Sequence, residues 1–232
     1  MNIKRFFYDK NFSAKERLWL FCALIFSSGF LGGFTFWIRG KLFVNAQTGN
    51  LVLLSTGIGT FDKIVIKNTL ALLILYFLGV AAAEIFSQMR ILKKGDSFRW
   101  EKILLLISIL STFIIGFVPE NFPYELTLYP VAFITAMQFA TFERAHGMGM
   151  ATGFCTNHLK QTATNLVRFF RTKDFSKLKI SLSHFSMIFS FVCGTSLAVF
   201  LGEIFSEKTI WGATVSYFII FIVFYKSCKD KK

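Results

Sequence analysis

The chain has 232 residues, of which 54% are hydrophobic and 18% aromatic, while only 17% are charged. A soluble domain carries about a quarter charged residues, so this composition favours a protein whose solvent is lipid. It excludes a disordered chain, a coiled coil and a small disulfide scaffold. The length leaves room for several transmembrane helices of about 20 residues and predicts one integral membrane domain over residues 1–232.

The chain carries 26 Lys and Arg against 13 Asp and Glu, a net charge of +13. In a soluble protein this excess would suggest a nucleic-acid partner. Here the basic residues gather between apolar stretches, at residues 1–17, 90–102, 168–179 and 226–232. The positive-inside rule for cytoplasmic loops explains this pattern more simply, so we expect no nucleic-acid partner.

Six stretches are apolar and long enough to cross a bilayer: residues 18–38, 68–89, 103–118, 126–142, 180–202 and 209–225. The first stretch is too long for the apolar region of a signal peptide and lacks an Ala-x-Ala end, so we expect it to be retained. Two further segments, 42–61 and 147–167, mix apolar residues with many polar residues and glycines. Neither segment could face lipid along its whole length.

The basic clusters decide whether these two mixed segments cross the membrane. If both crossed, the 90–102 cluster would lie outside and Lys160 would lie within the bilayer. If both enter and return on the same side, most basic residues face the cytoplasm, and the 119–125 loop, which has no Lys or Arg, lies outside. The sequence therefore predicts an all-α protein of the cell (inner) membrane with six transmembrane helices, two re-entrant half-helix segments and both termini cytoplasmic.

This topology predicts an inverted repeat, because each half, about 18–118 and about 126–225, contains three crossings. At one fixed offset, residues of the first mixed segment fall on identical residues of the second: Thr48, Leu51 and Thr56 on Thr156, Leu159 and Thr164. The next spans carry Gly79-x3-Ala83 and Gly194-x3-Ala198. This small-x3-small spacing lets helices approach closely.

The two re-entrant segments predict a binding site near the middle of the bilayer. A half-helix from Gly49 to Thr60, at about 1.5 Å per residue, covers a little over half of the ~30 Å hydrocarbon core. Its N-terminus, with Thr48 as the cap, would oppose that of the second segment, with Thr156 as the cap. Opposed helix N-termini form a weakly positive pocket. The substrate-binding residues predicted in these segments are Asn45, Gln47, Thr48, Gly49, Asn50, Thr156, Asn157, His158 and Gln161.

Helical spacing places His158, Gln161, Thr162 and Asn165 on one face of the second segment. We expect this polar face to meet water or a solute; the alternative is that these groups only satisfy backbone freed at the helix ends. With Lys160 nearby, His158 and the free N–H groups favour a ligand that carries a carboxylate, a phosphate or another electron-rich oxygen.

Catalytic and metal-binding motifs are missing from the sequence. There is no Gly-x-Ser-x-Gly, His-Glu-x2-His or Gly-x4-Gly-Lys. A hydrolase built on His184 or His146 would need a nucleophile positioned against the base, and no spacing provides one. The four cysteines are far apart and predict neither a zinc site nor a disulfide framework. We expect no enzyme activity, no cofactor and no metal site.

The stretch from Gly29 to Asn50 resembles the start of the YoaK-like family, multi-pass bacterial membrane proteins with a domain of unknown function. The most specific part of the resemblance is FVNAQTGN at residues 43–50, and the regions 136–138 and 152–156 are similar to further patterns of that family. This similarity adds Gln138 and Thr152 to the predicted substrate-binding residues. This sequence has Gly32 where the family often has Asp, Phe139 where it has Asn and Asn157 where it has Gly. The resemblance implies a fold and a membrane location but no substrate.

Together these features predict a transporter or channel for a small solute, anionic solutes included. The alternative is a non-transporting membrane scaffold that uses its small-residue faces to assemble with a partner. An aquaporin-type channel would need two Asn-Pro-Ala motifs, and no proline here follows an asparagine. The expected partners are the lipid bilayer and a small-molecule solute, and a homo-oligomer is left open.

Overall fold

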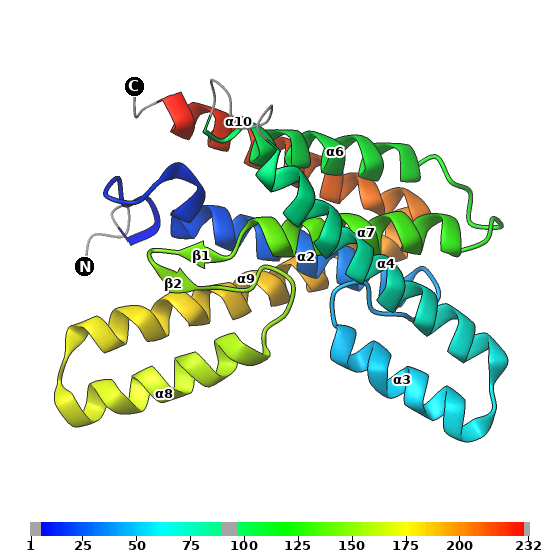
Figure 1. The fold of residues 1–232 in the computed structure, drawn as a ribbon, viewed down its shortest axis with the longest axis horizontal. Coiled ribbons are helices and arrows are strands. Elements are labelled where there is room, and N and C mark those ends of the chain that lie inside the picture. Colours follow the sequence, from blue (N-terminus) through cyan, green and yellow to red (C-terminus); the bar gives the residue numbers. More distant parts are fainter. Residues whose placement is uncertain (1–5, 90–96, 230–232) are drawn as a thin grey trace.

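The computed structural model describes residues 6–89 and 97–229, and most of this chain is helical (Figure 1). Its elements in chain order are η1 (Ala14–Glu16), α2 (Leu18–Trp37), α3 (Gln47–Thr60), α4 (Lys63–Gln88), α6 (Arg99–Ile115), α7 (Glu125–Thr141), β1 (Arg144–Ala145), β2 (Met148–Gly149), α8 (Thr156–Thr172), α9 (Phe175–Phe205), η2 (Ser206–Ile210) and α10 (Trp211–Lys229). Both chain ends and part of the basic cluster at 90–102 lie outside the described residues.

All six apolar stretches of the sequence fold as helices: α2, α4, α6, α7, α9 and α10. Helices α4 and α9 begin several residues before their apolar stretches because each has an aspartate cap. The Asp62 carboxylate accepts hydrogen bonds from the backbone of Ile64 and Val65, and the Asp174 carboxylate accepts one from the backbone of Ser176. Such caps satisfy N–H groups that the first helical turn leaves free.

The extent predicted for the two mixed segments is partly wrong. Helix α3 begins at Gln47 rather than at Gly49. In the second segment the helix starts at Thr156, the residue predicted as its cap, and residues 144–149 form the antiparallel hairpin of β1 and β2, which the sequence did not predict. The turn residues His146 and Gly147 both have positive φ (49° and 73°), the backbone of a two-residue hairpin turn. Helix α8 then extends to Thr172.

The helices pack in pairs. Helix α2 lies against α9 and α7 against α4, while α3 packs on α4, α8 on α9 and α6 on α10 (Figure 1). Glycines permit close approaches in two of these pairs. A Cβ at Gly194 of α9 would lie 2.1 Å from the carbonyl oxygen of Phe26, and a Cβ at Gly79 of α4 would lie 2.6 Å from that of Phe133. Any side chain at these positions would force the helices apart.

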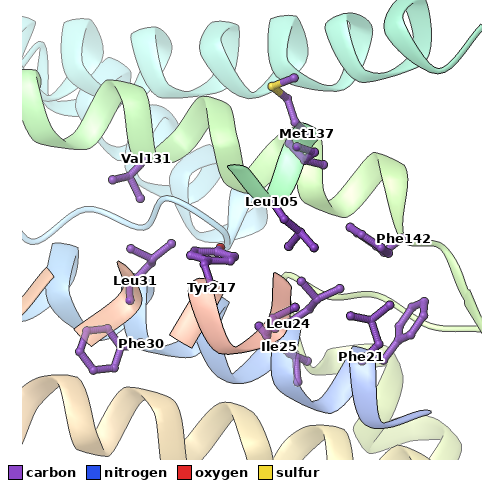
Figure 2. Packing of buried hydrophobic residues seen from close by; sticks show 14 of the residues in the cluster. Phe21, Leu24, Ile25, Phe30, Leu31, Leu105, Val131, Met137, Phe142 and Tyr217 are labelled. Carbon is purple, nitrogen blue, oxygen red and sulfur yellow. The ribbon is translucent and has the colours of Figure 1, made fainter. Parts of the chain in front are cut away.

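The hydrophobic core surrounds α2, whose residues are mostly buried. Leu31 of α2 lies close to Tyr217 of α10 and faces Val131 of α7, and Phe21 lies beside Phe142 at the other end of α2 (Figure 2). The outward faces of the other long helices are also apolar. Phe77 of α4 and Phe200 of α9, for example, are 71% and 64% exposed. A surface of this kind needs an apolar environment to cover it.

Three stretches of the described chain are long and apolar enough to cross a membrane: Leu18–Trp37, Lys63–Gln88 and Phe175–Lys229, the last of which includes α9, η2 and α10. With the apolar outer surface, these stretches give the all-α fold the character of a membrane protein.

Candidate functional site

The loop between α2 and α3 carries the chain back into the interior. The chain reverses at Gly40 and Lys41, both of which have positive φ. Before this turn, the buried guanidinium of Arg39 donates a 2.8 Å hydrogen bond to the carbonyl oxygen of Val118. After it, the Thr135 hydroxyl of α7 donates to the carbonyl oxygen of Val44 at 3.3 Å. These contacts fix residues 42–46 between α2 and α7.

Gln47 and Asn50 hold this loop closed. The Asn50 side chain is fully buried, and its amide Nδ2 donates to the carbonyl oxygen of Phe43 at 2.6 Å and to Oε1 of Gln47 at 3.0 Å. The Gln47 amide donates in turn to the carbonyl oxygen of Val44 at 3.1 Å. Both predicted site residues therefore bind their own loop. Within the described chain, Asn50 Oδ1 is buried without a hydrogen-bond partner.

The two predicted threonine caps are wrong. The residue before α3 is Ala46 and the residue before α8 is Cys155, and neither helix start has a side-chain cap. Thr48 and Thr156 are exposed in the first turns of these helices. Helix α3 starts earlier than predicted because the amides of Gln47 and Asn50 bind loop carbonyls and fix the turn ahead of Thr48.

Gly49 makes room for an aromatic pair beside α3. A Cβ at this position would lie 3.1 Å from the ring of Phe43. That ring stacks on Phe36 of α2, with 4.8 Å between the ring centroids. Gly49 therefore serves the packing of the loop against α2 through its small size.

A buried polar network joins the loop to three helices. Asn45 Nδ2 donates to the carbonyl oxygen of Ser28 at 2.8 Å, and Gln138 Nε2 donates to the Ser28 hydroxyl at 2.9 Å. The Tyr217 hydroxyl of α10 donates to Gln138 Oε1 at 2.7 Å. The structure thus brings together Asn45 and Gln138, which the sequence predicted as site residues. Ser28 and Tyr217 were missed, although each is a polar residue within an apolar stretch.

The loop before α8 is anchored by a pair of histidines. His158 is fully buried; its Nδ1 lies 2.8 Å from Nδ1 of His184 on α9, and its Nε2 lies 2.8 Å from the carbonyl oxygen of Ala151. Thr152, in the same loop, is fully buried, and in the described part of the chain its hydroxyl has no hydrogen-bond partner. Asn157 is exposed and lines a separate cleft with Phe139 and Glu143.

The polar face of α8 packs against α9. Besides the histidine pair, the Ser181 hydroxyl of α9 donates to the carbonyl oxygen of Thr162 at 2.8 Å. Within α8, Asn165 Nδ2 donates to the backbone and side-chain oxygens of Gln161. The apolar face, which includes Leu159, is exposed. Helix α9 thus covers His158, whereas Gln161 and Asn165 line a cavity between the two helices, so contact of this face with water or a solute stays a prediction.

A cavity of about 350 Å³ lies where the two loops meet. A Cβ placed on Gly153 would be 3.9 Å from the carbonyl oxygen of Asn45, so the loop before α8 touches the loop before α3. Helices α2 and α9 close the other sides. The lining residues are mostly apolar or aromatic: Gly32, Gly33, Phe36, Trp37, Phe43, Asn45, Ala46, Gly153, Phe154, Cys155, Thr156, Phe191, Thr195 and Val199.

The lining of this central cavity contains two predicted site residues, Asn45 and Thr156. Gln47, Asn50 and Gln138 support its loops through hydrogen bonds. Neither His158 nor Lys160 contributes to the lining. Among residues 6–89 and 97–229, no group of three His, Cys, Asp or Glu side chains could hold a metal ion.

The fold defines the class: an all-α protein with the character of a membrane protein, which has a cavity between the loops before α3 and α8. A profile of the family described as a protein of unknown function (DUF1275) matches residues 20–223, and the chain belongs to this family. This agrees with the resemblance to the YoaK-like group of multi-pass membrane proteins. No match was found among curated proteins, and none among solved structures.

Proposed function

We propose that the protein is a transporter or channel for a small solute in the cell membrane, with the solute bound in the central cavity. The observation that carries this proposal is that the loops before α3 and α8 meet around the cavity, with Asn45 on one side and Gly153 on the other. Non-helical backbone at membrane depth is tolerated where it lines a cavity or is buried in protein. Transporters place their sites at such interrupted helices.

The helix packing supports two inverted halves. Helix α2 packs on α9 as α7 packs on α4, and α3 packs on α4 as α8 packs on α9. The glycine contacts follow the same pairing, since Gly194 meets the Phe26 carbonyl and Gly79 meets the Phe133 carbonyl. Helices α3 and α8 both end at a residue of positive φ, Phe61 and Lys173. In both, an aspartate cap follows.

This pairing supports six transmembrane helices and two re-entrant ones. Helices α6 and α7 have 17 residues each, about 25 Å at 1.5 Å per residue, and they lie alongside the longer helices (Figure 1). The turn from α8 to α9 and the loop from α6 to α7 lie at opposite ends of the molecule (Figure 1). The first is rich in basic residues and the second has none, which favours a cytoplasmic position for the α8–α9 turn.

The cavity lining narrows the chemistry of the solute. Aromatic side chains such as Phe43 and Phe154 supply most of the wall, and Asn45, Thr156 and Thr195 supply the polar groups. No Lys or Arg lines the cavity. A neutral solute with an apolar body and one or two hydrogen-bonding groups therefore suits this cavity better than a strongly charged anion.

Solute flux into proteoliposomes tests the proposal. We would measure stopped-flow light scattering with glycerol, urea, acetate and benzoate as solutes, against protein-free vesicles. Gly153→Leu is the blocking variant, because a Cβ there meets nothing closer than 3.9 Å and a larger side chain enters the region between the loops. Gly59→Leu is the matched control, since nothing lies within 4 Å of a Cβ at that position.

We expect at least one solute to enter vesicles that contain the protein at least tenfold faster than it enters protein-free vesicles. Gly153→Leu should abolish this increase in rate, and Gly59→Leu should retain it. If no solute gains in rate, or if Gly153→Leu transports like the wild type, the transport proposal is wrong. The alternative of a membrane scaffold, assembled with further copies or another protein, would then be preferred.

A further inference from the structure

A second cavity, separate from the central one, lies between α8, α9 and the β1–β2 hairpin. Its volume is about 280 Å³. Polar and basic side chains from the two helices dominate the wall, and β2 covers one side: Gln161, Asn165, Arg168, Lys177, His184 and Gly149. This cavity shares no residue with the central cavity, so the transport proposal does not involve it.

The cavity has two cations and no anion to balance them. Arg168 and Lys177 line it from α8 and α9, and no Asp or Glu lines it. Among residues 6–89 and 97–229, a salt bridge joins Lys15 to Glu101, and it involves neither Arg168 nor Lys177. The acid of the α8–α9 turn, Asp174, accepts hydrogen bonds from the backbone N–H and the hydroxyl of Ser176, at 2.8 and 2.7 Å.

The hydrogen bonds of the histidine pair determine which ring nitrogen is left for this cavity. Because a carbonyl oxygen only accepts, His158 Nε2 donates to Ala151, and Nδ1 of a neutral His158 must accept. His184 Nδ1 is then the donor of the 2.8 Å bond between the rings. His184 Nε2 takes no part in the bond between the rings, and His184 is one of the residues that line the cavity.

The Gln161 amide is oriented in a similar way. Asn165 Nδ2 donates to Gln161 Oε1 at 3.2 Å and to the Gln161 carbonyl oxygen at 2.9 Å. These bonds use the acceptor end of the Gln161 side chain and leave its NH₂ group as a donor. The cavity therefore gathers a guanidinium, an ammonium and an amide donor, with an imidazole nitrogen beside them.

We propose that this second cavity binds a phosphate-type oxyanion between Arg168 and Lys177. A guanidinium matches two phosphate oxygens at once, and a lysine adds a point charge. The face of α8 that is turned away from the cavity is apolar and exposed, with Leu159, Val167 and Phe170 at 64%, 57% and 60% exposure. Acyl chains could cover that face, so the phosphate belongs either to an anionic phospholipid headgroup or to a free phosphate compound.

The experiment uses the purified full-length protein and two probes. One arm measures binding of phosphatidylglycerol in nanodiscs against phosphatidylcholine, and the other measures inorganic phosphate against chloride at equal ionic strength. The test variant is Arg168→Gln combined with Lys177→Gln. The control is Arg171→Gln combined with Lys173→Gln, because these two cations are exposed near the same end of α8 and do not line the cavity.

We expect the test variant to bind phosphatidylglycerol or inorganic phosphate at least tenfold more weakly than the wild type does, and the control variant less than twofold more weakly. The melting temperatures of both variants should be close to that of the wild type. Loss confined to phosphatidylglycerol identifies a lipid headgroup, and loss with inorganic phosphate identifies a soluble phosphate; both outcomes support the site. If the wild type prefers neither probe, or if the control loses as much as the test variant, the site is refuted. Flux through the central cavity is a separate readout, which Arg168→Gln with Lys177→Gln should leave unchanged.

Discussion

Helices α3 and α8 occupy similar places in the fold but differ in what their polar side chains do. Each follows a loop that reaches the central cavity, and each packs against the next helix. In α3 the hydroxyls of Ser55, Thr56 and Thr60 donate to backbone oxygens one turn earlier in the same helix. In α8 the corresponding polar face makes hydrogen bonds to α9 through His158 and Thr162. The two helices therefore pack in the same way but use their polar side chains differently.

This difference shows where function can reside. A helix whose side-chain hydroxyls donate to its own backbone presents few free donors or acceptors to a ligand, so its role is structural. Helix α8 instead has a histidine pair and free donors beside a basic cavity. The pairwise packing of the helices would then be the same in both proposed halves, whereas anion binding would belong to the second half alone.

The largest effect should come from filling the glycine contacts between α2 and α9 and between α4 and α7, which correspond to each other in the proposed inverted halves. Gly194→Leu and Gly79→Leu each drive a side chain into a backbone carbonyl, at 2.1 and 2.6 Å from the Cβ. We expect each to lower the free energy of unfolding by about 3 kcal/mol or more, with Gly194→Leu the more severe. Unfolding in a detergent titration, with Gly59→Leu as the unaffected control, measures this. A severe effect in only one of the two glycine variants would break the similarity of the halves.

The second prediction concerns the loop before α3. Asn50→Ala removes both amide bonds that close the loop on Phe43 and Gln47. It leaves the Phe43 carbonyl without this donor in a partly buried position, so we expect a loss of about 1 to 3 kcal/mol in the free energy of unfolding. Asn157→Ala, at an exposed position near the start of α8, should change it by less than about 0.5 kcal/mol. Equal effects would show that the two loops are held in the same way.

The sequence predicted the helices much better than it predicted the helix ends. Apolar stretches of about 20 residues are a local property, so all six were found. The ends depend on caps such as Asp62, on the loop bonds of Asn50 and on the turn at His146, which hydropathy does not record. The hairpin of β1 and β2 was missed because its strands have two residues each, too few for a periodic pattern.

The site was predicted only in part. Asn45 was predicted as a polar residue of a mixed segment and Gln138 from the resemblance to the YoaK-like family, and the structure places both in one buried network. Tyr217 was missed because a tyrosine in a span is usually an interfacial residue. His184 was considered only as the base of a hydrolase. Its bond to His158 depends on α8 lying along α9, a tertiary contact that no local spacing encodes.

The third prediction tests the histidine pair, which α3 lacks. In a double-mutant cycle of His158→Ala and His184→Ala, the two losses should not add, because each variant removes the same Nδ1–Nδ1 hydrogen bond. We expect a coupling of about 0.5 to 3 kcal/mol in the free energy of unfolding. The pair Asn50→Ala and Ser55→Ala in and around α3, which share no hydrogen bond, should be additive within about 0.5 kcal/mol. Additive losses for the histidines would mean that the two rings act independently.

The smallest effect concerns the hairpin that only the second half possesses. His146 lies in its turn, and its Nε2 accepts a 3.4 Å hydrogen bond from the backbone N–H of Leu18 at the start of α2. Burial, with the positive charge of Lys179 nearby, lowers the pKa of His146 below its usual 6.5. The folded protein therefore holds this imidazole neutral where the unfolded chain would protonate it. The stabilisation is present at pH values above about 6.5 and declines as the pH falls through that value toward the lowered pKa.

We accordingly expect the melting temperature of the wild type in detergent to decrease between pH 7.5 and pH 5, and to decrease less in His146→Gln. Glutamine does not titrate, and its Oε1 can accept from the Leu18 N–H as the imidazole does. At pH 7.5 the two proteins should therefore melt within a few degrees of each other, and the gap between their pH profiles should open only on acidification. Parallel profiles over this range would place the titration elsewhere, and the hairpin would then contribute to α2 through its backbone bond from His146 to the carbonyl oxygen of Glu16, 2.8 Å long, which no change of pH in this range affects.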